Sequence, residues 1–481
     1  MHIHPLDLAI VVLYLLGVTA LGIYFRRGQQ DVRDYFLGGR TAPWWAIAFS
    51  IVATETSTLT IIGTPAIAYG GNLTFLQLVF GYLIGRILIV LLLLPGYFRG
   101  EYFTAYALIE KRFGPRMRSL AASTFLITRA LAEGVRVAAI ALVVSVALGT
   151  SIRLAVFLVI ALTIVYTFEG GMKAVIWTDV AQCLLYLAGS VVTFFFLLHR
   201  IPGGWSEVSQ VAAASGHKLQ FLDFSFHLAT KYTFWSGLIG GAFLTMASHG
   251  TDQTIVQRLL AARNERDSRA ALLVSGVIVL MQFTLFLLVG VLLFVFSQHT
   301  PLLAPGARLD AILPTFLVRE MPTGLAGILL ASILAVAMSN VSGSLNSLAA
   351  STVLDFSRLS GRQTNPEEFL RLSRRITLVW GAVLIGFSLV SWGPLLEAGL
   401  TVVSFPFGSL LGLFLLGTFD KRATGVGATV GMFCGLAAIF SFWRFTSIAY
   451  PWYFFLGTAV TFSVGSLMSR ILPARAAERS A

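Results

Sequence analysis

Apolar stretches of about 20 residues recur along the whole chain, separated by short polar segments. A helix of this length spans the hydrocarbon core of a bilayer. The alternating pattern of an outer-membrane barrel is absent. The pattern therefore predicts an all-α polytopic membrane protein with about thirteen transmembrane helices. The predicted spans are residues 6–25, 43–70, 74–98, 119–149, 153–168, 174–199, 233–250, 271–298, 325–350, 376–393, 397–418, 423–442 and 449–469.

Composition and charge support this class and give an orientation. Hydrophobic residues make up 57% of the chain and charged residues 12%, whereas ordinary soluble domains carry about 25% charged residues. With the N-terminus outside and the C-terminus inside, 24 of the 34 Lys and Arg fall in inside loops and seven in outside segments. This split follows the positive-inside rule. The net charge of +12 therefore reflects topology in the inner or plasma membrane, and no nucleic-acid partner is implied. Because the N-terminus lacks a basic segment before its apolar stretch, we interpret residues 6–25 as a retained helix.

Two spans carry polar residues at their centres, where lipid makes them expensive. The span 43–70 contains Ala-Thr-Glu-Thr-Ser-Thr-Leu-Thr at 53–60, and the span 325–350 contains Ser-Asn-Val-Ser-Gly-Ser at 339–344. Such residues are typical of a path for an ion or a polar solute. The second span (43–70) and the seventh (233–250) both contain helix-breaking residues. An offset of five helices reverses the direction of entry, so this pattern indicates an inverted repeat.

Several motifs resemble those of the sodium:solute symporter family, and the resemblance covers residues 7–470. It implies a single membrane domain, 1–481, with a LeuT-type five-plus-five inverted repeat. The leading helix would be 6–25, the repeats 43–199 and 233–418, the trailing helices 423–470 and the cytoplasmic tail 471–481. The motifs are YFLGGR (35–40), YTFEGGMKAVIWTDVAQ (166–182), GTDQTIVQR (250–258), SGSLNSL (342–348) and GSLLGLFLLG (408–417).

The resemblance also implies a sodium site between the broken span and the span 325–350. Sodium is a hard cation that prefers oxygen ligands, and an unwound helix supplies free carbonyls. The implied ligands are the carbonyls of Ala53, Thr56 and Val336 and the side chains of Ser339 and Asn340. Most of the family has a hydroxyl residue at position 340. The alternative is that Ser339 bonds back to its own helix and Asn340 joins neighbouring helices.

Asp179 is a carboxylate within an apolar span and needs a counter-charge or an ion. Some relatives bind a second sodium with this aspartate and serines of the span 325–350. This chain retains Ser339 and Ser342 but has Gly343 where those relatives have serine. Asp179 and Ser342 are therefore candidates for a second ion or an ion-release path, with a structural role for Asp179 as the alternative. We expect one sodium per solute.

The predicted solute ligands surround the broken span. They begin with Glu55, which has three possible roles: compensating charge near sodium, contacting the solute, or pairing with Arg129 or Arg136. On the span 119–149, Arg129, Glu133 and Arg136 are three or four residues apart. They therefore suit an intrahelical ion-pair ladder as well as a solute carboxylate contact. The full predicted set is Glu55, Ser57, Thr60, Phe75, Gln77 and Arg136.

The sequence thus predicts a sodium-coupled symporter that imports a small polar organic solute (a sugar, amino acid or carboxylate) by alternating access. A proton-coupled carrier of the same fold and a membrane solute sensor are alternatives. An enzyme is disfavoured because no catalytic triad or metal motif accompanies His249 and Asp252. We interpret His249 as a packing residue that also bonds to the adjoining loop, and Arg86 as an anchor between helices. Beyond sodium, the solute and the lipid bilayer, no obligate protein partner is indicated.

Overall fold

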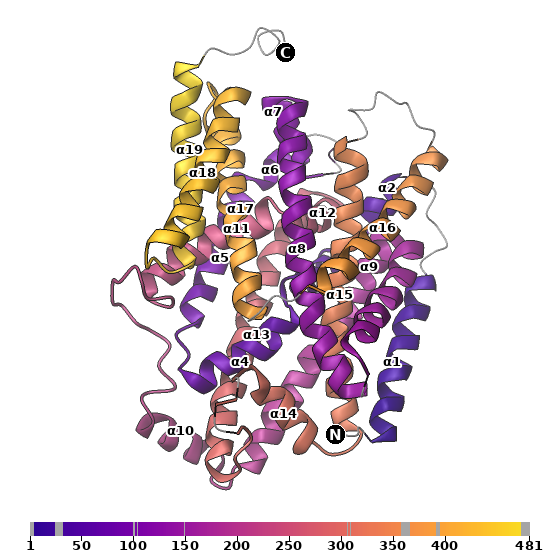
Figure 1. Ribbon diagram of the computed structural model, residues 1–481, viewed down its shortest axis with the longest axis vertical. Coiled ribbons are helices and arrows are strands. Elements are labelled where there is room, and N and C mark those ends of the chain that lie inside the picture. The colour runs from indigo at the N-terminus through magenta and orange to yellow at the C-terminus, as the bar shows by residue number, and fades with distance from the viewer. Residues whose placement is uncertain are drawn as a thin grey trace.

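The computed structural model describes residues 4–24, 32–99, 102, 104–148, 150–304, 306–307, 309–356, 366–390 and 395–472. Within these ranges the chain forms helices and no strand, as the sequence predicted (Figure 1). The helix α1 begins at one end of the long axis and α19 ends at the other. The predicted tail lies largely outside the described residues. The first ten helices are α1 (Pro5–Tyr24), α2 (Val32–Leu37), α3 (Trp44–Glu55), α4 (Thr58–Gly70), α5 (Leu76–Leu92), α6 (Leu94–Phe98), α7 (Tyr106–Phe113), α8 (Pro115–Leu148), α9 (Ile152–Arg200) and α10 (Gly204–Ala214).

The remaining elements follow a non-helical segment after α10. They are a single π turn η2 (Ser236–Gly240), α11 (Gly241–Gly250), α12 (Gln253–Leu260), α13 (Glu265–His299), α14 (Ile312–Arg319), α15 (Leu325–Phe356), α16 (Pro366–Ser388), α17 (Leu395–Phe419), α18 (Gly425–Phe445) and α19 (Pro451–Ile471), with short 3₁₀ turns at Gly38–Arg40 and Leu309–Ala311.

Length and hydropathy qualify six helices of the described chain as membrane spans, and a seventh if α3 and α4 are one bent span. The helix α9 differs from expectation, because it runs without a break through both predicted spans 153–168 and 174–199. Its 49 residues would extend about 73 Å, more than twice the hydrocarbon thickness. One crossing therefore does not account for α9, and the thirteen-span count stays a prediction.

The helix break predicted in span 43–70 is present between α3 and α4, which are bent by 67°. Thr56 and Ser57 have extended backbones. The Ser57 side chain accepts from the Thr60 amide, and the Thr60 hydroxyl accepts from the Ser57 amide, which forms a capping box. Since the Ser57 amide donates to Thr60, it no longer donates to the Ala53 carbonyl four residues earlier. A local sequence signal thus both restarts the helix and frees carbonyl oxygens.

A second interruption separates α11 from α12. The helix α11 ends at Gly250, and the Asp252 side chain caps α12 by accepting from the Thr254 amide at 2.7 Å. This break lies in the GTDQ motif, directly after the seventh predicted span. The helical structure is therefore interrupted within the second predicted span, 43–70, and at the end of the seventh, 233–250.

Glycines let α5 cross η2 and α11 with their backbones in contact. A Cβ on Gly81 would lie 2.3 Å from the Gly237 carbonyl oxygen, and a Cβ on Gly241 would lie 2.3 Å from the Leu78 carbonyl oxygen. Small residues permit this close approach of membrane helices. Any larger side chain at these crossings would push the two helices apart.

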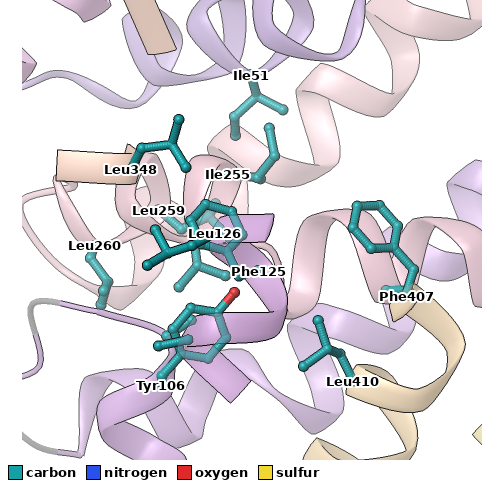
Figure 2. Packing of buried hydrophobic residues seen from close by; sticks show 14 of the residues in the cluster. Ile51, Tyr106, Phe125, Leu126, Ile255, Leu259, Leu260, Leu348, Phe407 and Leu410 are labelled. Atoms are coloured by element: carbon teal, nitrogen blue, oxygen red, sulfur yellow. The ribbon is translucent and has the colours of Figure 1, made fainter. Parts of the chain in front are cut away.

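A buried apolar cluster joins α12 to α8 and α17. Figure 2 shows Phe125 and Leu126 of α8 beside Leu259 of α12, with Tyr106 of α7 and Leu410 of α17 nearby. All of these side chains are buried. The cluster connects elements that are far apart in sequence, and it adjoins the cavity described next.

Candidate ion and solute site

A cavity of about 230 Å³ adjoins the break between α3 and α4. One wall is aromatic: the rings of Phe75 and Phe283 stack at 5.4 Å, and Tyr82 meets Phe283 edge-on at 6.2 Å. Phe125 and Phe407, from the apolar cluster of Figure 2, also line it. The cavity therefore offers apolar faces for a carbon skeleton. Its polar lining comes from α3, α4, α8 and α11 and from the residues that cap α4 and α12. It includes Glu55, Ser57, Thr60, Thr64, Arg129, Arg136, Ser248, His249 and Asp252.

Five of the six predicted solute ligands line this cavity, and Gln77 does not. The Gln77 side chain is buried, its amide nitrogen donates to the Tyr232 carbonyl at 3.1 Å, and its amide oxygen accepts from the Asp223 backbone amide at 2.9 Å. These contacts attach α5 to the segment between α10 and η2. The residues brought together at the cavity are Glu55, Ser57, Thr60, Phe75 and Arg136.

Glu55 forms an ion pair with Arg86, and not with Arg129 or Arg136, the two partners that the sequence suggested. Its Oε2 also lies 3.3 Å from His249 Nε2. Both contacts use Oε2, which leaves Oε1 for a further donor. The Arg86 side chain is 1% exposed and that of Glu55 is 12% exposed. Hence α3, α5 and α11 meet through a buried charge cluster on the cavity wall.

Arg86 is held by more than its ion pair. Its Nε lies 3.3 Å from the Ser275 hydroxyl of α13, and its NH1 lies 3.3 Å from the Tyr82 carbonyl. The expected anchoring of helices by Arg86 is therefore present. His249 was interpreted as a packing residue, but it lines the cavity beside Glu55. The sequence signal for this charge cluster was Arg86 itself, an arginine inside an apolar span. Its partner Glu55, 31 residues earlier, could not be identified from the sequence.

The ion-pair ladder predicted on α8 is present. Glu133 Oε2 lies 3.5 Å from Arg129 NH2 and 3.4 Å from Arg136 NH1, and it accepts from the Ser344 hydroxyl of α15 at 2.9 Å. Arg136 is the more accessible arginine, with a side chain 21% exposed against 9% for Arg129. Arg136 therefore belongs to the ion-pair ladder and also lines the cavity.

Two of the carbonyls implied as sodium ligands converge on the Asn340 side chain. Its Nδ2 donates to the Thr56 carbonyl at 2.6 Å and to the Val336 carbonyl at 3.0 Å, while Arg136 NH1 donates to its Oδ1 at 3.4 Å. Because carbonyls accept and a guanidinium donates, only this amide orientation satisfies both sides. The Ser339 side chain lies outside the described residues. Asn340 thus joins α15 to the broken helix, as the structural alternative expected, and it does so at the place where the carbonyl ligands meet.

Asp179 of α9 is paired with Arg258 of α12. Its Oδ2 lies 2.8 Å from Arg258 NH2, both side chains are 0% exposed, and the Ser50 hydroxyl of α3 donates to the same oxygen. The sequence predicted a counter-charge or an ion for Asp179. In the structure the counter-charge is Arg258, the last residue of the GTDQTIVQR motif. Ser342, the other candidate for a second ion, is fully buried.

Comparison with known proteins identifies the class. The structure superimposes with a TM-score of 0.91 and 28% identity on a Na⁺-coupled sialic acid symporter, solved in a substrate-bound outward-open state that revealed a novel Na⁺ site, over 98% of this chain and 99% of that one. Mhp1, a nucleobase-cation-symport-1 family transporter, shares the fold alone, with a TM-score of 0.60 and 16% identity over 90% of this chain and 93% of that one. The fold is that of a secondary transporter.

The sodium:solute symporter family model matches residues 35–435, and the chain belongs to this family. It is 32% identical to the sodium/sialic acid symporter SiaT of Proteus mirabilis (strain HI4320), over 90% of this chain and 88% of that protein. It is 30% identical to the human sodium/iodide cotransporter, over 90% of this chain and 68% of that protein. Membership makes the chain a multi-pass membrane transporter that uses sodium as its coupling ion, and not an enzyme.

Proposed function

We propose that this protein imports a small polar organic solute together with sodium, which binds at the break between α3 and α4. The observation that carries the proposal is the convergence of the Thr56 and Val336 carbonyls on one point, within 3.0 Å of Asn340 Nδ2. Two carbonyls aimed at a common position suit a small cation. The freed Ala53 carbonyl and the Ser339 and Asn340 side chains complete the proposed ligand set.

The coupling ion supplies enough free energy for accumulation. One sodium entering across about 100 mV yields about 2.3 kcal/mol, and a tenfold sodium gradient adds about 1.4 kcal/mol. Together these amount to roughly 3.7 kcal/mol, which sustains a solute gradient of a few hundredfold.

The proposed solute carries a carboxylate and at least one hydroxyl or amino group. Arg136 offers a guanidinium on one wall, and Glu55 keeps Oε1 for a donor on another. Ser57 and Thr60 add hydroxyls, and Phe75 adds an aromatic face. SiaT and NanT, whose names specify sialic acid, are among the relatives that support an acidic solute.

We further propose that Asn340 connects the two sites. Sodium at the Thr56 and Val336 carbonyls would displace Asn340 Nδ2 from them, and the amide would have to turn its oxygen toward the cation. That turn would remove the acceptor that Arg136 NH1 now contacts. The guanidinium would then be released for a solute carboxylate, so sodium binding would favour solute binding.

The topology we propose has about thirteen spans, an outside N-terminus and an inside C-terminus. The repeats are 43–199 and 233–418, preceded by the leading helix 6–25 and followed by the trailing helices 423–470. The asymmetric distribution of Lys and Arg supports this orientation.

The test uses purified protein in liposomes. A panel of hydroxy acids, amino acids and sugars is first screened by thermal stabilisation with sodium or choline present. Uptake of any stabilising solute is then measured with an inward sodium gradient at equal pH. We expect uptake with sodium and none with choline. Equal uptake in choline, driven by a pH gradient alone, would refute sodium coupling.

A further inference from the structure

The side chain of Thr56, the first residue after α3, has partners on two other helices. Its Oγ1 accepts from the amide Nε2 of Gln282, on α13, at 2.8 Å and lies 3.3 Å from the hydroxyl of Tyr186, on α9. It donates to the Val52 carbonyl of α3 at 2.8 Å. Thr56, Tyr186 and Gln282 are at most 2% exposed. One side chain therefore attaches the break between α3 and α4 to both α9 and α13 in the interior of the domain.

The hydrogen bonds of this cluster follow one another in a series. The Tyr186 hydroxyl also lies 3.2 Å from Gln282 Oε1. A phenol has one proton, and Thr56 already receives a proton from Gln282, so Tyr186 donates to the amide oxygen. The bonds thus run from Tyr186 to Gln282, from Gln282 to Thr56 and from Thr56 to the Val52 carbonyl. In this arrangement Tyr186 holds the Gln282 amide with its nitrogen toward Thr56.

The cluster orients a residue whose carbonyl is a proposed sodium ligand. Thr56 has an extended backbone, with φ −77° and ψ 117°, and its carbonyl accepts from Asn340 Nδ2 of α15 at 2.6 Å. A carbonyl outside a helix can rotate with its peptide plane. Bonds that fix the Thr56 side chain to α9 and α13 restrict this rotation. Groups that hold metal ligands in this way set the orientation of the ligands and the affinity for the ion.

The cluster lies apart from the solute cavity. Thr56, Tyr186 and Gln282 are not among the described residues that line that cavity. Any effect of Tyr186 or Gln282 on transport therefore has to pass through the break in the helix, because neither side chain reaches the solute. The sequence carried no local signal for these contacts, since Tyr186 and Gln282 are 130 and 226 residues away from Thr56.

We propose that Gln282 and Tyr186 are positioning residues for the sodium site. They hold Thr56 so that its carbonyl points to the place where the Val336 carbonyl converges with it. Gln282 acts on Thr56 directly, and Tyr186 acts through Gln282. This inference rests on the proposed sodium site at the break, and it adds two residues that set the affinity of that site without contacting the ion.

The experiment measures the dissociation constant of radioactive sodium on purified, folded protein, without solute and in a choline background of constant ionic strength. Loss of a group that orients a metal ligand lowers metal affinity about 10–100-fold. We expect Gln282→Leu to raise the sodium dissociation constant about tenfold. Tyr186→Phe should raise it by a smaller factor, because Gln282 can still donate to Thr56. The matched control is Gln298→Leu, at an exposed α13 residue that donates to its own helix, and it should leave the constant unchanged.

A double variant separates positioning from general damage. If Tyr186 acts through Gln282, Tyr186→Phe/Gln282→Leu should have the dissociation constant of Gln282→Leu alone, whereas independent effects would multiply. An unchanged constant in Gln282→Leu, or multiplied effects in the double variant, would overturn the inference. If Gln282→Leu does not fold, Tyr186→Phe decides, and an unchanged constant there refutes the proposal. A wild-type protein that binds no sodium would refute the proposed sodium site itself, and this inference with it.

Discussion

Replacing Glu55 by glutamine should destabilise the protein, because Arg86 would lose its counter-charge. The Arg86 side chain is 1% exposed, so its guanidinium would remain buried and uncompensated. Removing one partner of a buried ion pair costs about 3–5 kcal/mol. We expect the lower end, about 3 kcal/mol, since the cavity gives the 55 side chain some access to water.

This free energy translates into a measurable thermal shift. Unfolding entropy is about 2.1 cal/mol/K per residue, or roughly 1 kcal/mol/K for a chain of this length. Glu55→Gln should therefore lower the unfolding midpoint by about 3 °C, measured by fluorescence-detected unfolding in detergent. The matched control is Glu265→Gln, which breaks the exposed pair with Arg269 on α13. An exposed i, i+4 pair contributes about 0.3–0.5 kcal/mol, so the control should shift the midpoint by less than 1 °C.

A double-mutant cycle separates the ion pair from general damage. Glu55→Gln/Arg86→Gln removes both charges and should be more stable than the sum of the two single changes predicts, by at least about 1 kcal/mol. If Glu55 also contacts the solute, Glu55→Gln should raise the solute concentration for half-maximal uptake more than the sodium concentration. Two results would refute a stabilising role for the pair of Glu55 and Arg86. One is an unfolding midpoint of Glu55→Gln equal to that of Glu265→Gln, and the other is a double variant whose loss of stability equals the sum of the two single losses.

Four further predictions follow from other contacts. Asn340→Ser should keep sodium-driven uptake, while the gain in solute affinity produced by sodium, typically 5–150-fold in coupled systems, should fall to about threefold or less; an unchanged gain in a binding assay would refute the Asn340 connection. Asp7→Ala should cost about 1–3 kcal/mol in thermal stability, because Asp7 accepts from the Gly324 and Gly327 amides at 2.7 and 2.8 Å, whereas Asp7→Asn keeps an acceptor and should cost less. Single cysteines at exposed Arg266 and Gln220, introduced after replacing Cys183 and Cys434, should react with impermeant thiol reagents from inside and outside the cell respectively; reaction from the same side would refute the proposed topology. The hydrogen bond from Ser466 holds the pKa of Asp420 below its ordinary value of 3.8. Asp420→Asn should therefore lower the free energy of unfolding by at most about 1 kcal/mol at neutral pH, and this difference from wild type should disappear as the pH falls below 3.8 through the lowered pKa of the folded protein.

The sequence predicted the helical class and the broken span because both depend on local signals. Apolar length identifies a membrane helix, and the hydroxyls of Ser57 and Thr60 form the cap that interrupts α3 and starts α4. It did not predict that α9 continues from Ile152 to Arg200. The apolar stretches predicted two spans, 153–168 and 174–199, with a short segment between them. That segment contains Gly170 and Gly171, but glycine only weakens a helix and need not end it.

The charge partners were the least predictable part of the site. A charge inside an apolar span must be neutralised, so the sequence indicated that Asp179 and Glu55 need partners. Which arginine fills each role depends on how α3, α5, α9 and α12 pack, and the separations of 31 and 79 residues carry no local pattern. The ladder on α8 was predictable because its members share one helix face.

The glycine crossing of α5 with η2 and α11 determines which parts of the cavity can change shape. Their backbones touch, so neither helix can slide along the other without collision, and the two should move as one body. This body carries Phe75 and His249, which line the cavity, and Arg86, which forms the ion pair with Glu55. Distances among these three residues should therefore stay constant while α8, which carries Arg136, moves relative to them. The side formed by α5 and α11 would then determine which solute shapes the cavity accepts. Movement on the side of α8 would control access to the cavity.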